Sequence, residues 1–174
     1  MKKISIFFVI LVVCIFTSNL FSQEFSYVGA AKCKICHKSE KQGEQFLIWE
    51  SSMHYQSFKP LTLDETIAKV GDAPENPKCL KCHAPLYEKA LELKEEGVTC
   101  EVCHGPGSVY KKLSIMKDRE EAIKNGLIIY DSAEATKTKC LTCHDAETFD
   151  FDSSWEQIKH PIPKKNERIN QYPN

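Results

Sequence analysis

Residues 97–107 read Gly97-Val98-Thr99-Cys100-Glu101-Val102-Cys103-His104-Gly105-Pro106-Gly107, and the C-x-x-C-H at their centre recurs three more times in the 174-residue chain. The four copies are Cys33/Cys36 with His37, Cys79/Cys82 with His83, Cys100/Cys103 with His104, and Cys140/Cys143 with His144. The ninth cysteine, Cys14, lies in the apolar N-terminal stretch. Every cysteine beyond that stretch therefore belongs to one repeated motif. The uneven spacing of the copies excludes a tandem array of identical modules.

This repeated motif is typical of covalent haem attachment. The two thiols add across the two vinyl groups of the porphyrin, and the histidine that follows reaches the iron. We therefore expect four covalently bound haem c groups, held by the eight motif cysteines. The proximal iron ligands are then His37, His83, His104 and His144.

Two other uses of paired cysteines compete with this interpretation. Four C-x-x-C pairs could form two Cys₄ zinc sites, and four disulfides are a second option in an exported protein. Neither option explains why a histidine follows every pair. Haem attachment accounts for the whole pattern, so it is preferred.

The N-terminal segment has the layout of a secretory signal peptide. Lys2 and Lys3 precede an apolar run from Ile4 to Phe16, which is short for a membrane span. We expect residues 1–22 to be the signal, with Cys14 lost on cleavage; an uncleaved anchor is the alternative. The expected mature protein, residues 23–174, is a single tetrahaem domain with a polar tail at about 162–174. It is periplasmic or otherwise exported and has no stable membrane span.

Charge indicates the kind of partner. The net charge is −1, and removal of residues 1–22 takes away two lysines and no acid, which leaves −3. No basic patch suited to nucleic acid is visible. Acidic charge favours docking to basic redox proteins of the cell envelope, either transiently or within an oligomer or larger redox complex.

The expected fold is mainly α with extensive loops, a compact multihaem cytochrome whose haems form much of the core. Periodicity predicts a helix at 39–58, a second from about Thr62 and a third at about 87–94. Another is predicted from Ser108 to about Asn125, ended by Gly126. No strand-like alternation of useful length appears. We expect the apoprotein to be poorly folded.

The distal iron ligands are fewer than the haems. Only His54 and His160 remain after the four proximal histidines, and both are predicted distal ligands. Met116 is a weaker distal candidate, since a helical methionine is more often a packing residue. At least one haem is therefore expected to be five-coordinate or water-ligated, unless a partner protein donates a ligand.

The sequence resembles the cytochrome c-554 family of tetrahaem electron carriers. Residues 97–107 are similar to that family's G-V-x-C-E-x-C-H-G-P-G string, and Trp49 with His54 is similar to its W-x-x-x-x-H element. Residues 140–161 are similar to the corresponding end of related multihaem proteins, so the resemblance covers about 27–161. It implies closely packed haems, with His54 as a distal ligand and one haem five-coordinate.

One departure from the family concerns residues 108–112. The family carries a further distal histidine shortly after the G-P-G turn, whereas this chain reads Ser108-Val109-Tyr110-Lys111-Lys112. Two haems therefore lack an assigned distal ligand. The region around Tyr110, where the family's distal histidine is missing, is the part of the chain where their coordination is most in question.

Three functions fit these features. We favour an electron carrier between envelope redox partners over an enzyme, so no catalytic residue is assigned. The alternative is a haem enzyme that reduces a small nitrogen oxide or peroxide at a five-coordinate haem, with Tyr110 as a proton donor. A third is a subunit whose haems extend an electron path through a larger complex.

Overall fold

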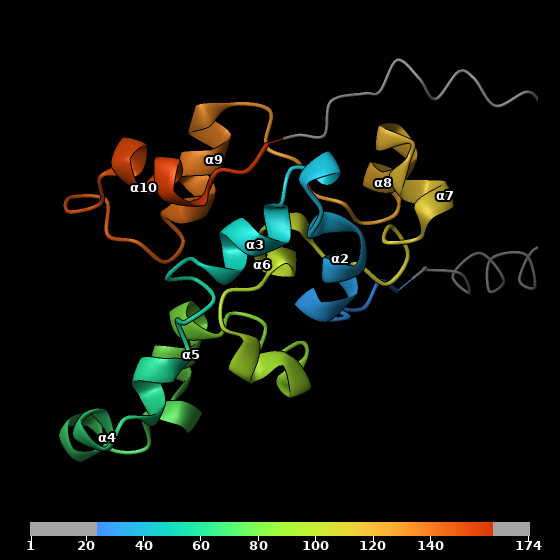
Figure 1. Cartoon of the computed structure of the whole chain (residues 1–174). Coiled ribbons are helices and arrows are strands. Elements are labelled where there is room, and N and C mark those ends of the chain that lie inside the picture. The colour runs from blue at the N-terminus through green and yellow to red at the C-terminus, as the bar shows by residue number, and fades with distance from the viewer. Residues whose placement is uncertain (1–23, 162–174) are drawn as a thin grey trace, which may run out of the picture.

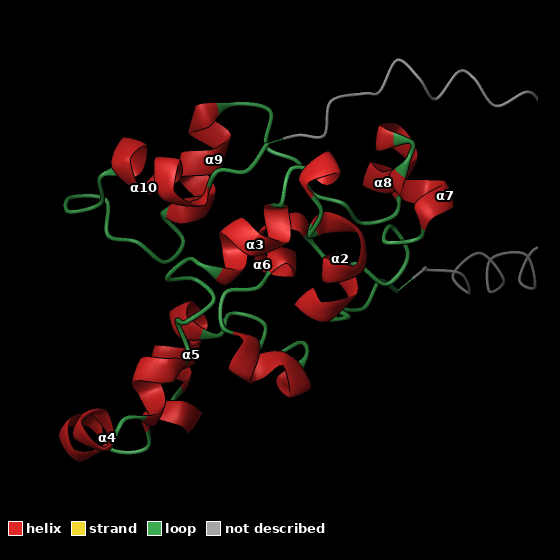
Figure 2. Ribbon diagram, in the orientation of Figure 1, coloured by secondary structure: helices red, strands yellow, loops and turns green. Residues whose placement is uncertain are grey.

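The protein was analysed as a computed structural model that describes residues 24–161, and in this range it consists of short helices and loops with no strand (Figure 2). The α-helices are α2 (Ala30–His37), α3 (Gln45–Glu50), α4 (Asp64–Val70), α5 (Pro77–His83), α6 (Cys100–His104), α7 (Leu113–Met116), α8 (Arg119–Lys124), α9 (Ala133–Cys140) and α10 (Phe151–Ile158). The 3₁₀-helices are η1 (Glu40–Gln42), η2 (Lys59–Thr62), η3 (Ala73–Glu75) and η4 (Leu91–Glu96). The predicted mainly helical fold with extensive loops is confirmed.

Helices α2, α3 and α6 lie together at the centre of the molecule, with three groups of helices around them (Figure 1). Helices α7 and α8 form one group, and α9 and α10 form another. The third contains η2, α4, η3 and α5, which pack on one another. Its apolar cluster consists of Phe58, Leu61, Ala73, Leu80 and Ala84.

Each helix that carries a C-x-x-C-H motif begins at a defined cap. Asn76 caps α5, Thr99 caps α6 and Ser132 caps α9, each through a side-chain oxygen that accepts a backbone N–H of the first turn. Helix α2 begins after Gly29, which has no side chain to do this. The backbone N–H of Ala30 instead donates to the carboxylate of Glu96, 2.8 Å away.

The carboxylate of Glu101 joins three segments of the chain. It is 1% exposed and accepts the backbone N–H groups of Val28 at 2.9 Å, Gly29 at 2.8 Å and Gly107 at 2.6 Å. A buried carboxylate needs such donors, because leaving it unpaired is strongly unfavourable. Glu101 therefore holds the start of α2 against α6 and against the turn that follows α6.

The predicted helix at 39–58 is wrong. The chain forms η1 and α3 there, separated by Gly43 at φ 95° and Glu44 at φ 54°, and irregular turns follow Glu50. Two successive residues in the left-handed region cannot continue a right-handed helix. The periodicity of the apolar residues was present, but the backbone break was not apparent from it.

The other helix predictions are correct in part. Helix α4 begins at Asp64, and the hydroxyl of Thr62 donates to the carbonyl of Lys59 rather than capping it. The segment 87–94 forms turns and η4. The segment 108–125 divides into α7 and α8, because Asp118 caps a new helix. Gly126, at φ 101°, follows the end of α8 as expected.

The described polypeptide buries few large apolar side chains. They are Phe46, Phe58, Leu61, Leu80, Leu86 and Tyr110. By contrast, Ile35 inside the first motif is 73% exposed and Leu113 is 61% exposed. Large apolar groups bound against these side chains would complete a core that the chain alone leaves small.

The predicted signal peptide and polar tail lie outside the described residues. Across residues 24–161, no helix has the length and apolar character needed to cross a membrane.

Replacing Glu101 with alanine should destabilise the protein. The three backbone N–H groups would lose their acceptor, and hydrogen bonds to a charged group are each worth roughly 1.5–3 kcal/mol, so the free energy of unfolding should fall by at least about 3 kcal/mol. Denaturant unfolding of the haem-loaded protein, followed by far-ultraviolet circular dichroism, measures the change. The exposed Glu95→Ala variant is the control. Equal stabilities of the two variants would contradict this role for Glu101.

Candidate haem-binding sites

Each motif presents its two cysteines and its histidine from one turn of helix. The first three copies lie within α2, α5 and α6. In the fourth, α9 ends at Cys140, but the N–H groups of Cys143 and His144 still donate to the carbonyl of Cys140 at 3.1 and 3.0 Å. All four copies therefore place the histidine one turn after the first cysteine.

The motifs lie next to one another in an order that differs from their order in the chain. The thiols of Cys33 and Cys100 lie close enough for each to shift the pKa of the other, which places the motif at 33–37 (motif one, in chain order) beside the motif at 100–104 (motif three). The thiols of Cys140 and Cys143 are close enough to Cys103 to raise its pKa, after the larger effect of burial, which joins motif three to motif four. The Cys82 sulfur is 4.0 Å from the carbonyl oxygen of Cys143. The spatial order is therefore one, three, four, two.

Two pairs of histidines lie close together, with similar separations between their rings and with the ring planes tilted to each other. The ring centres of His54 and His144 are 6.2 Å apart, and those of His104 and His160 are 5.8 Å apart. A metal bound by two imidazoles on opposite sides holds their centres about 6 Å apart, since each metal–nitrogen bond is about 2 Å and each nitrogen lies roughly 1 Å from its ring centre. Both pairs fit this spacing, and each combines one motif histidine with one histidine from outside the motifs.

The electrostatics of these rings favour the neutral form that binds a metal. Burial lowers the pKa of His54, and the charge of His144 lowers it further. Burial is also the main cause of the lowered pKa values of His104 and His160. The neutral imidazole has a free nitrogen lone pair, so these histidines are poised for ligation rather than protonation.

Three motif histidines have an oxygen beside the ring nitrogen Nδ1. His83 Nδ1 lies 2.6 Å from the carbonyl of Ser57, His37 Nδ1 lies 3.3 Å from Gln45 Oε1, and His104 Nδ1 lies 3.4 Å from the carbonyl of Ile128. An oxygen acceptor at Nδ1 fixes the proton there and leaves Nε2 free to bind iron. Ser57 and Gln45 thus support the site, and sequence reasoning missed both.

The segment before motif three positions His54. The indole N–H of Trp49 donates to the carbonyl of Val98 at 2.8 Å, and the N–H of Val98 donates to the carbonyl of His54 at 3.1 Å. Gly97 is at φ 69°, where a Cβ atom would lie 2.5 Å from the Ser57 hydroxyl. This close approach ties the turn that carries His54 to the start of α6.

Gln45 supports His160 as well as His37. Its side-chain amide donates to the carbonyl of Gln42 and to that of Pro161, the latter at 3.1 Å. Pro161 follows His160 directly, so one side chain connects the surroundings of motif one with the histidine that lies near motif three.

The Gly-Pro-Gly turn after motif three is built for close backbone contact. Gly105 is at φ 78°, and a Cβ atom there would lie 2.4 Å from the carbonyl oxygen of Gly126. The Tyr110 hydroxyl donates to the carbonyl of Gly105 at 2.9 Å, and burial raises the pKa of this tyrosine well above its usual range. Tyr110 is therefore a protonated anchor for the turn.

A cavity of about 240 Å³ opens beside motif one. Its walls include Cys33, Cys36 and His37 of the motif, together with Tyr110, Leu113 and Met116. The structure thus brings the weaker distal candidate, Met116, to the first motif.

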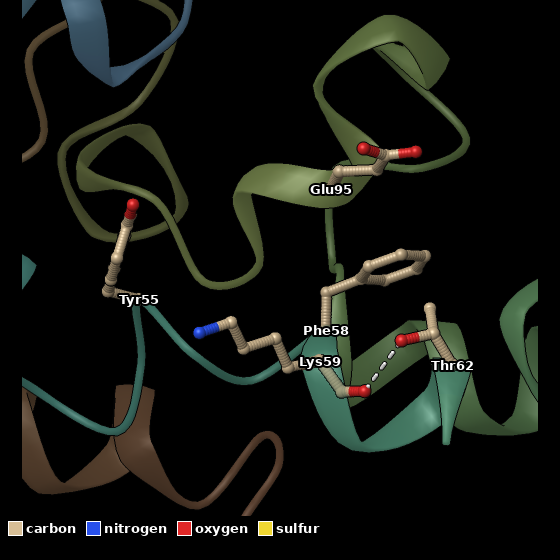
Figure 3. A pocket seen from close by; sticks show the side chains of 5 residues that line it. All are labelled: Tyr55, Phe58, Lys59, Thr62 and Glu95. Atoms are coloured by element: carbon tan, nitrogen blue, oxygen red, sulfur yellow. Dashed lines mark hydrogen bonds between the residues drawn. The ribbon is translucent and has the colours of Figure 1, made fainter. Parts of the chain in front are cut away.

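A second cavity, of about 280 Å³, is lined by Tyr55, Phe58, Lys59, Thr62 and Glu95 (Figure 3). It contains no cysteine or histidine, so it is not an attachment site of the kind that the motifs define.

The two competing uses of the cysteines gain no support. Among the described residues, the eight motif cysteines form no disulfide. No group of three or more histidine, cysteine, aspartate or glutamate side chains in that range could hold a metal ion by itself. The donor sets are instead thiol pairs with single or paired histidines, which fit haem.

Comparison with known proteins defines the class. Residues 32–105, which contain the first three motifs, match the family model described as cytochrome c554 and c-prime. This part of the chain is thus similar to c-type cytochromes of that family.

Among these proteins, the chain is similar to cytochrome c-554 of Nitrosomonas europaea, with 24% identity over 162 residues. The match covers 78% of this chain and 63% of the relative, so the chain spans less than two thirds of the relative's length. No solved structure matches the chain. The resemblance to the cytochrome c-554 family that was noted from residues 97–107 is confirmed.

Replacing Gly105 with alanine should destabilise the protein more than replacing Gly71. Both glycines have φ near 80°, but a Cβ at Gly71 meets nothing within 4 Å, whereas at Gly105 it would collide with the backbone of Gly126. Strain from positive φ costs about 1–3 kcal/mol in both variants, and the collision adds to it only in Gly105→Ala. Denaturant midpoints of the two haem-loaded variants give the difference. Equal midpoints would mean that the turn adjusts freely.

Proposed function

We propose that this chain is an exported tetrahaem c-type cytochrome that transfers electrons between redox partners of the cell envelope. The cysteine pairs at 33/36, 79/82, 100/103 and 140/143 hold four haems. Each haem supplies an iron that is reduced and oxidised by one electron. The polypeptide attaches and orients these groups, and it supplies the ligands that set their potentials.

The observation that carries this proposal is the closeness of His54 to His144 and of His104 to His160. In each pair, one ring follows a cysteine pair directly and the other comes from a distant segment. The separations suit two ligands on one iron. Ligation by two histidines closes the metal to substrates and favours electron transfer over catalysis.

The arrangement of the motifs supports a transfer role. Motifs three and four, which have the paired histidines, are central in the spatial order, and motifs one and two stand at its ends. An uninterrupted row of neighbouring attachment sites suits electron passage through the molecule, and two ends offer separate places to meet a donor and an acceptor.

The surroundings of Tyr110 favour a carrier over an enzyme. A catalytic haem needs a proton donor beside its open face. The Tyr110 hydroxyl is buried and donates to the carbonyl of Gly105, so it is committed to the turn. The neighbouring Lys111 is exposed.

Replacing His54 or His160 with alanine should convert one low-spin haem to high spin, because each variant removes the sixth ligand of one iron. Electron paramagnetic resonance and absorption spectra of the oxidised protein measure the change, and mass spectrometry should still show four haems. The double variant should convert two. Met53→Ala, beside His54 and 76% exposed, is the control and should leave the spectra unchanged. Unaltered spin states in His54→Ala would exclude it as a ligand.

The proposed carrier should not turn over small oxidants. The reduced protein should pass its electrons to a redox partner, while nitrite, nitric oxide, hydroxylamine and peroxide should each be consumed no faster than by free haem. Stopped-flow spectroscopy of the reduced haems follows both processes. Sustained multiple turnover with one of these compounds would instead support the haem enzyme that was considered from the sequence.

A further inference from the structure

We infer that the Met116 thioether is the sixth ligand of the iron bound at His37, so that motif one holds a haem with histidine and methionine ligation. This inference rests on the proposed function, because it assumes a haem at Cys33 and Cys36. It assigns a ligand to one of the two haems that the histidines leave incomplete.

The histidines themselves define the vacancy. All six lie within the described residues, and four of them form the two close pairs. His37 and His83 remain, each directly after a cysteine pair. The iron at His37 is therefore either five-coordinate or takes its sixth ligand from another residue type, from water or from outside the chain.

The cavity beside motif one limits the choice of ligand. Besides the motif itself, its walls are Lys32, Ser39, Gln42, Tyr110, Lys111, Leu113 and Met116. The Tyr110 hydroxyl already donates its hydrogen bond to the carbonyl of Gly105, away from the role of a ligand. An ammonium group has no lone pair, and serine and glutamine offer only weakly binding neutral oxygens. Met116 is the one lining side chain with a neutral soft donor, of the kind that ligates iron in cytochromes c.

The local structure makes Met116 suitable for this role. It is half-buried, it is the last residue of α7, and it lines the same cavity as Cys33, Cys36 and His37 of α2. Its long unbranched side chain can adapt to the position that the iron requires. Tyr110 anchors the start of this segment to the Gly105 turn, which holds α7 near motif one.

Methionine ligation gives motif one a distinct chemistry. A thioether stabilises the reduced iron relative to a second imidazole and raises the reduction potential. The haem at one end of the spatial order would then have a higher potential than the two central haems. Electrons that enter the protein would collect at the α2 end, next to Lys32 and Lys111.

The test compares Met116→Leu with Met53→Leu in the haem-loaded protein. Leucine nearly preserves side-chain volume and removes the sulfur, so folding should be kept. The wild type should show the near-infrared charge-transfer band of methionine bound to ferric haem. Met116→Leu should lose this band and convert one low-spin haem to high spin, whereas Met53→Leu should keep both signals. A third variant, Met116→His, should lose the band, stay low-spin at this haem and lower its midpoint potential.

The outcomes separate this inference from the proposed function. If mass spectrometry shows four haems, and the His54 and His160 variants behave as expected, but Met116→Leu retains the wild-type spectra, the methionine ligand is excluded and the carrier stands. Fewer than four haems, with none at Cys33 and Cys36, would overturn both.

Discussion

The buried carboxylate of Glu101 is the interaction on which the arrangement of the motifs depends. It lies between the two cysteines of motif three and accepts N–H groups from the start of α2 and from Gly107. A buried carboxylate that loses its donors is strongly destabilised, so the three segments must stay together while the carboxylate is buried. The contact of the Cys33 and Cys100 thiols follows from this constraint. Glu101 and the Gly105-Pro106-Gly107 turn act as one unit, because the N–H of Gly107 donates to the Glu101 carboxylate. This bond is a physical reason for the occurrence of the glutamate and the turn together in residues 101–107.

How much the sequence could predict depends on the range of the interactions involved. The C-x-x-C-H turns are local, and all four form as expected. Asn76, Thr99 and Ser132 could have been recognised as caps, because their partners are two or three residues away. The helix predicted at 39–58 does not form, because Gly43 and Glu44 adopt left-handed conformations. Pro161 lies against this turn, and a contact so remote in sequence could not be predicted. Ser108 was expected to cap a helix, but its hydroxyl accepts the N–H of Ser26.

The candidate ligands also divide into features that are local in the sequence and features that depend on contacts between distant segments. Counting histidines identified His54 and His160 as distal candidates, but their pairing with His144 and His104 depends on how distant segments fold together. Nothing in the sequence indicated a role for Gln45, because a glutamine at the start of a helix has many ordinary roles. Its position between His37 and Pro161 is visible only in three dimensions. From the sequence, Met116 was only a weak candidate ligand, because a methionine in a helix is usually a packing residue. Its place in the cavity beside motif one makes it a stronger candidate.

The order of the motifs in space has a consequence for how the protein matures. Neighbouring motifs are far apart in the chain: the Cys82 and Cys143 contact alone spans 61 residues. To bring these motifs together, the entropy of closing long loops must be overcome before native contacts offset it. Few buried apolar side chains are present to do so early. Covalent attachment would therefore precede folding, with each haem joined to a largely open chain. The row of sites would then assemble late, when His160 near the C-terminus reaches motif three.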